Sequence, residues 1–103
     1  MRFGRRDSTH AEIRDELRAL GADVIDLGDV GDNVTDLLVG LCGRDFQVEA
    51  KGPKGKLSEG QRKHFETWRG QKPILLRSRM EAREWLIRTR HDLIGRNDQR
   101  LLA

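Results

Sequence analysis

Two acidic residues and a lysine stand beside apolar segments in the middle of the chain. Asp36 opens the run DLLVGLC, and Glu49 and Lys51 end the next apolar stretch with only Ala50 between them. Two carboxylates at one place raise each other's pKa, a conflict that a hard divalent cation removes. Because Mg²⁺ prefers one or two carboxylates, waters and phosphate oxygens, this set of residues is typical of phosphodiester hydrolysis.

The segments that carry these residues must pair for the side chains to meet. Residues 36–42 are almost continuously apolar, which predicts a strand buried on both faces. Residues 46–50 alternate apolar and polar, which predicts a return strand after a turn at 43–45. Because the two strands of a hairpin are antiparallel, we expect Asp36 to lie beside the end of the second strand.

The side chains of Glu49 and Lys51 should project together, since residues two apart on a strand share a face. Lys51 would then orient or deprotonate the attacking water, or neutralise charge on the phosphate. The backbone carbonyl of Ala50 is a further candidate metal ligand. Glu-x-Lys by itself is common on exposed strands, so the interpretation depends on the apolar segments around it.

The remaining patterns predict one α/β domain over residues 1–103, in the order helix, three strands, helix, strand, helix. Ser58 with Gln61 and Ser78 with Glu81 form capping-box patterns at two helix starts. The mixed sheet should have about four strands flanked by helices. The other predicted segments are a basic lead-in at 1–8, a helix from Thr9 to Gly21, a strand at 22–27, a loop at 28–34, a basic loop at 52–56, a helix from Ser58 to Gly70, a strand at 72–77, a helix from Ser78 and a tail at 95–103.

Composition excludes some classes of protein. Cys42, the only cysteine, permits neither an intrachain disulfide nor a cysteine-based zinc site, and we expect it to be buried. No apolar stretch approaches the ~18 residues of a membrane span, and the first residues lack the apolar segment of a signal peptide. We therefore expect a cytoplasmic protein with no membrane partner and no organic cofactor.

The basic residues predict where nucleic acid would bind. Lys+Arg total 20 against 17 Asp+Glu, a formal net charge of +3 that names no partner by itself. Phosphate contacts by basic side chains give sequence-independent, salt-sensitive affinity. Only 5% of the residues are aromatic, which argues against a stacking platform, and Trp68 and Trp85 are expected in the core. The candidate contacts are Lys54, Lys56, Arg62, Lys63, Arg5 and Arg6; the arginines of 83–90 are more typical of a solvated helix face.

The segments TDLLVG, VEAKG and LSEGQRKHFETW, in this order, resemble the PD-(D/E)xK nuclease superfamily. The resemblance is closest to small virus-type replication-repair nucleases and to Holliday-junction-resolvase-like phage nucleases, and runs from about His10 to Trp85. It implies a restriction-endonuclease-like core that binds Mg²⁺ or Mn²⁺ and cleaves DNA. The matching site residues are Asp36, Glu49, Lys51 and Gln61. Thr35 stands where the family usually has Pro.

Two residues have an alternative structural role. Glu12 matches a first-helix glutamate of the family, which implies a catalytic and metal-binding role, but three residues after Thr9 it also fits a capping box. Glu16, one turn further on, is its rival. Gln61 either reaches back to Ser58 as a cap or, as the resemblance implies, faces Lys51, water or phosphate.

The sequence thus predicts a metal-dependent nuclease acting on DNA, on branched or flap structures and as a homodimer, in the host cytoplasm if a phage encodes it. A non-catalytic nucleic-acid-binding domain of the same fold is the alternative. A small interaction protein with a chance Glu-x-Lys is a third interpretation.

Overall fold

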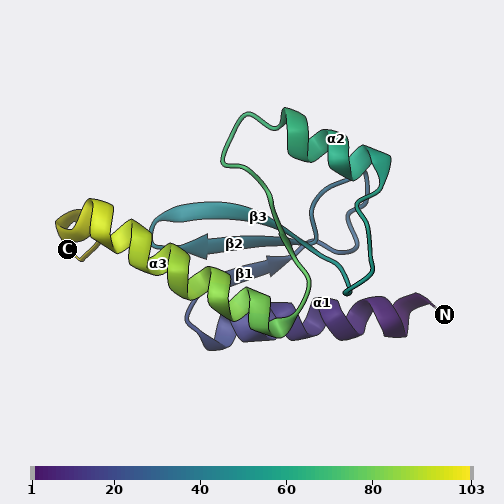
Figure 1. The fold of residues 1–103 in the computed structure, drawn as a ribbon, viewed down its shortest axis with the longest axis horizontal. Coiled ribbons are helices and arrows are strands. Elements are labelled where there is room, and N and C mark those ends of the chain that lie inside the picture. The colour runs from purple at the N-terminus through teal and green to yellow at the C-terminus, as the bar shows by residue number, and fades with distance from the viewer. Residues whose placement is uncertain (1, 103) are drawn as a thin grey trace.

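The computed structural model describes residues 2–102, with side chains described for residues 8–95. The elements follow the predicted order, and Figure 1 shows the sheet with its three helices. An α/β domain with a four-stranded mixed sheet is confirmed. The elements are α1 (Arg2–Ala19), β1 (Asp23–Asp26), β2 (Leu37–Leu41), β3 (Arg44–Ala50), α2 (Glu59–Thr67), β4 (Ile74–Leu76) and α3 (Arg79–Leu102).

The strands lie in the order β1-β2-β3-β4. Strands β1, β2 and β3 pair antiparallel, whereas β4 pairs parallel to β3 after the crossover through α2. Among the described residues, no helix combines the length and the apolar character needed to cross a membrane.

The turn between β2 and β3 is tighter than predicted. Leu41 pairs with Arg44, so Cys42 and Gly43 alone make the turn, with φ values of 52° and 77°. Two positive φ values are what the type I′ hairpin turn requires, because its twist matches that of the strands. The turn predicted at 43–45 is therefore wrong by position, and Cys42 is half-buried rather than fully buried.

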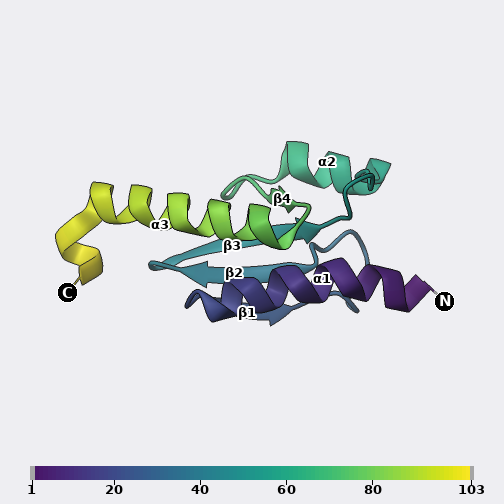
Figure 2. The ribbon, with the colours of Figure 1, turned by 60° about the horizontal axis from the view of Figure 1, so that its bottom comes forward.

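One face of the sheet carries the apolar core. Alternate residues of β2 and β3 point to this face, and α1 and α3 cover it side by side (Figure 2). The ring of Phe46 on β3 meets Trp85 of α3 edge to face, with centroids 5.2 Å apart. The buried residues of this face include Ile13, Leu17, Leu37, Val39, Leu41, Val48 and Leu86.

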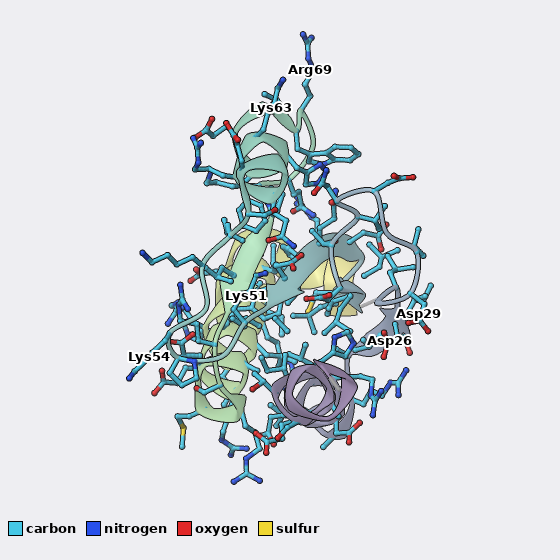
Figure 3. All side chains as sticks on the ribbon, turned by 90° about the vertical axis from the view of Figure 1, so that its right-hand side faces the viewer. Asp26, Asp29, Lys51, Lys54, Lys63 and Arg69 are labelled. Atoms are coloured by element: carbon cyan, nitrogen blue, oxygen red, sulfur yellow. The ribbon has the colours of Figure 1, made fainter. Side chains whose placement is uncertain are left out.

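The other face of the sheet is more polar and lies under α2, although it also carries the half-buried Leu38. Gln47 and Glu49 alternate with the core residues of β3 and therefore point away from the core. Figure 3 views the molecule from one end, with α2 on one side of the sheet and α1 and α3 on the other. None of the residues 59–67 is fully buried, although Phe65 is half-buried, and hydrogen bonds from Gln61 and His64 to β3 help to hold α2 in place.

Two helix boundaries differ from the predictions. Helix α1 begins at Arg2 rather than at Thr9, so residues 2–8 are helical rather than an irregular lead-in, and Thr9 caps nothing. Helix α3 continues to Leu102 through the predicted tail. A threonine caps a helix only where the residues before it leave the helical conformation. Residues 2–8 contain no proline that would force this, so the helix extends through Thr9 toward the N-terminus.

Trp68 is not a core residue. Trp85 is 8% exposed, as predicted, but Trp68 is 49% exposed. Helix α2 ends at Thr67, and the backbone of Trp68 is extended, with φ −64° and ψ 129°. The prediction of a buried Trp68 assumed that the helix continues through it. Because α2 ends one residue earlier, Trp68 does not follow the helical spacing that would bury it.

Candidate metal site

The pairing of β2 with β3 brings Asp36 and Glu49 together. Leu37 pairs with Val48, and the next pair in the same register is Asp36 with Glu49. The Asp36 Oδ2 atom accepts a hydrogen bond of 2.8 Å from the Ala50 N–H. A side chain thus continues the ladder at the point where the backbone pairing of β2 ends.

The carboxyl group of Glu49 is deeply buried. Its residue is 3% exposed, and burial together with the neighbouring Asp36 carboxylate raises the pKa of Glu49 to about 8. Its Oε2 atom lies 3.9 Å from Lys51 Nζ, which partly offsets this increase. Its Oε1 atom is buried and has no hydrogen-bond partner among the described residues. A buried carboxyl oxygen beside a second carboxylate needs either a proton, which the raised pKa of Glu49 favours, or a cation to satisfy it.

Gln61 makes the predicted cap and also faces the site, where it contacts Glu49 rather than the predicted Lys51, water or phosphate. Its Oε1 accepts a hydrogen bond of 2.9 Å from the Ser58 N–H, and the Gln61 N–H bonds back to Ser58 Oγ, so the predicted capping box is present. Its Nε2 donates a 3.0 Å hydrogen bond to Glu49 Oε2. The helix cap therefore fixes the amide that orients the Glu49 carboxylate.

The loop after Lys51 is held by Arg77, at the end of β4. The Arg77 guanidinium donates to the carbonyls of Gly52, at 2.9 Å, and Gly55, at 2.5 Å. These hydrogen bonds hold the backbone of the loop, while the side chains of Lys54 and Lys56 remain exposed. Figure 3 shows Lys51 at this end of the sheet and Lys54 further out on the loop.

His10 of α1 faces the site and was missed in the sequence. It is 6% exposed, its Nε2 lies 2.8 Å from Asp26 Oδ1, and its Nδ1 lies 3.8 Å from Asp36 Oδ1. Partial burial acts to raise the pKa of Asp26, but hydrogen bonds from the Gly28 N–H, His10 and Arg14 lower it to about 2. An ionised carboxylate only accepts, so the His10 Nε2 carries the proton.

The helical periodicity of α1 contains the signal that would have found His10. His10 precedes the buried Ile13 and Leu17 by three and seven residues, which places all three on one face of the helix. The same geometry turns Glu12 away from the sheet, and Glu12 is exposed. Glu16 instead accepts an ion-pair contact of 3.3 Å from Arg83 on α3. The structure therefore brings neither glutamate to Asp36 and Glu49.

The structure describes two of the other four candidate contacts. Arg62 and Lys63 are exposed on α2. The side chains of Arg5 and Arg6 lie outside the described residues. Thr35, in the place of the expected proline, is 1% exposed, and its hydroxyl lies 3.5 Å from the Leu37 carbonyl.

The donor set is small. Within residues 8–95, no group of three or more His, Cys, Asp or Glu side chains is arranged to enclose a metal ion by itself. The two adjacent carboxylates nevertheless match the needs of Mg²⁺, which keeps several waters and takes only one or two carboxylates. Comparisons of the chain with protein-family models, with curated proteins and with solved structures find no match.

Proposed function

We propose that this protein is a metal-dependent nuclease that hydrolyses DNA phosphodiester bonds, with a core of the restriction-endonuclease type. The observation that carries the proposal is the buried Glu49 Oε1 atom, which has no partner among the described residues beside a second carboxylate, Asp36. A divalent cation at this place would bind that oxygen as a ligand and remove the repulsion between the carboxylates.

Asp36, Glu49 and the Ala50 carbonyl are the proposed ligands. The Ala50 N–H points toward Asp36, and the carbonyl of a strand residue points to the same neighbouring strand as its N–H. When bound, Mg²⁺ or Mn²⁺ would polarise the phosphoryl group and lower the pKa of a water. Gln61 fixes the Glu49 carboxylate, and His10, held by Asp26, positions Asp36.

Lys51 is the proposed contact to the scissile phosphate. Its ammonium group is partly exposed, with 23% of the side chain accessible, and is directed toward Glu49 at 3.9 Å. A phosphate oxygen beside the carboxylates would meet this positive charge as negative charge accumulates on it. The ordered loop with Lys54 and Lys56, and the exposed Arg62 and Lys63 on α2, would bind the flanking phosphates.

Cleavage of plasmid and branched DNA in Mg²⁺ or Mn²⁺ tests this proposal. We expect the wild-type protein to cut, and Lys51→Ala and Glu49→Gln to lose at least about 100-fold in rate. Glu66→Gln, an exposed change on α2, is the matched control and should retain full activity. Calorimetric titration with Mn²⁺ should show one site that Glu49→Gln abolishes.

Two outcomes would reject the proposal. If purified protein binds DNA with no cleavage in either metal, the non-catalytic domain is the better interpretation. If Lys51→Ala cleaves as fast as the wild type, the activity belongs to a contaminant or to another site.

A further inference from the structure

Trp68 is an exposed aromatic side chain whose position is fixed from two sides. Its indole ring lies beside the imidazole of His64, with centroids 5.2 Å apart and planes inclined by 39°. A Cβ atom at Gly70 would lie 2.6 Å from the indole Nε1, so only glycine lets the backbone approach this closely. His64 is in turn anchored to Gln47 by a 2.7 Å hydrogen bond. A large apolar ring is thus held in place while about half of the residue stays exposed.

The segment around Trp68 is rich in basic side chains. Residues 61–72 contain four basic side chains and one acidic side chain, and all five are exposed. In Figure 3, Lys63 and Arg69 extend outward from this end of α2. An exposed indole among basic side chains suits a ligand that has both negative charge and flat rings, because bases stack on the ring and phosphates meet the cations. The charged residues are Arg62, Lys63, Glu66, Arg69 and Lys72.

The position of Trp68 relative to Glu49 follows from the contacts of α2. Gln61 bonds to Glu49 and His64 bonds to Gln47, so α2 runs along β3 away from the site. Gln71 then reaches the Asp45 carbonyl further along the same strand. At about 3.3 Å per strand residue, Trp68 lies on the order of 10 Å from Glu49. An unpaired strand covers this distance with a few nucleotides.

The low aromatic content argued against a stacking platform of several rings, but we infer that Trp68 by itself stacks on an unpaired base of the substrate, a few nucleotides from the scissile bond at Asp36 and Glu49. The substrate class is therefore DNA with a single-stranded portion, such as a flap or a fork, rather than continuous duplex. In a duplex the bases face each other inside the helix and offer no free ring to an external indole. This inference rests on the proposed function for the location of the scissile phosphate.

Binding measured in EDTA separates this inference from the cleavage reaction. The probes are an unlabelled oligo-dT, a forked duplex and a blunt duplex of equal length. We expect oligo-dT and the fork to quench the emission of Trp68. Trp68→Ala should lower the affinity for both about 10-fold or more and change that for the blunt duplex less than about 2-fold, whereas Trp68→Phe should retain most of the affinity.

Two variants provide the controls. The double variant Lys54→Ala with Lys56→Ala removes phosphate contacts. It should lower the affinity for all three probes alike and reduce the salt dependence of binding. Met80→Ala removes another exposed apolar side chain, which is 60% exposed on α3, and should leave the affinity for each probe unchanged.

Several results would overturn the inference. An equal loss for all three probes in Trp68→Ala would show a general effect, and no loss for any probe would exclude stacking. A wild-type dimer in sedimentation that Trp68→Ala dissociates would assign the indole to a protein interface. Selective binding through Trp68 without cleavage in Mg²⁺ would instead reject the hydrolase and keep the base-stacking surface.

Discussion

The two faces of the sheet are covered in different ways. On one face, Leu37 and Val48 pack against apolar residues of α1 and α3. On the other face, Gln47 and Glu49 form hydrogen bonds with α2, which has no buried residue along 59–67. Apolar burial supplies most of the favourable free energy of folding, whereas a buried carboxyl group costs free energy unless it is paired. The first face therefore stabilises the fold, and the second face holds the costly polar groups at which we propose a metal site.

The largest difference should appear between two neighbouring residues of β2. Leu37 is fully buried on the apolar face, and Leu38 is half-buried on the polar face. Leu37→Ala should lower the free energy of unfolding by about 3 kcal/mol, because it leaves a cavity in the core. Leu38→Ala, its matched control, should cost about 1 kcal/mol. Urea denaturation measures both, and equal losses would contradict the division between the faces.

The pH dependence of stability should sharpen the comparison. The pKa of Glu49 is raised from 4.5 to about 8, so the unfolded chain releases this proton first as the pH rises. The free energy of unfolding should therefore decrease between about pH 4.5 and 8, by a few kcal/mol at about 1.4 kcal/mol per pKa unit. In EDTA, Tm should fall from pH 5 to pH 8.5, and Mg²⁺ should restore it by binding the ionised carboxylates.

The control for this effect is Glu49→Gln, which removes the titrating group and should flatten the curve. The pH range starts well above the pKa of about 2 of Asp26, so the Asp26–His10 contact keeps its ionised carboxylate throughout. If Glu49→Gln shows the same slope as the wild type, the loss of stability comes from another group.

The smallest of the three effects concerns His10. His10→Ala should weaken Mn²⁺ binding about 10- to 100-fold, because Asp36 loses the side chain that positions it. His10→Gln can still donate to Asp26 and should recover part of the affinity. His91→Ala, an exposed change on α3, should have no effect. Calorimetry on folded variants gives these affinities, and an unchanged value for His10→Ala would remove His10 from the site.

Much of the fold was predictable because local patterns and packing agree. The apolar run before Cys42 and the alternation before Ala50 give paired strands, and the Ser58–Gln61 capping box starts α2 as predicted. The approach of Asp36 to Glu49 followed from the antiparallel hairpin alone, despite the error in the turn position, because the ends of the strands still meet.

The remaining features depend on tertiary structure. Trp68 has the spacing of a core residue, but its exposure depends on the polar sheet face below α2. Glu12 and His10 are both polar residues near the predicted helix start, and only the orientation of α1 decides which one faces the sheet. Local patterns specify an element and its apolar side, but they do not specify which polar side chains come together.

The two-residue turn at Cys42 and Gly43 has a consequence for changes of chain length. An amino acid inserted there without a change to a longer, bulged turn would shift the strand alignment by one position and send the side chains of β3 to opposite sides of the sheet. Val48 would then point toward α2, and Glu49 would point into the apolar core. An insertion of two residues would preserve the alternation of side chains between the two faces. The length of this turn is therefore constrained more strictly for one inserted residue than for two.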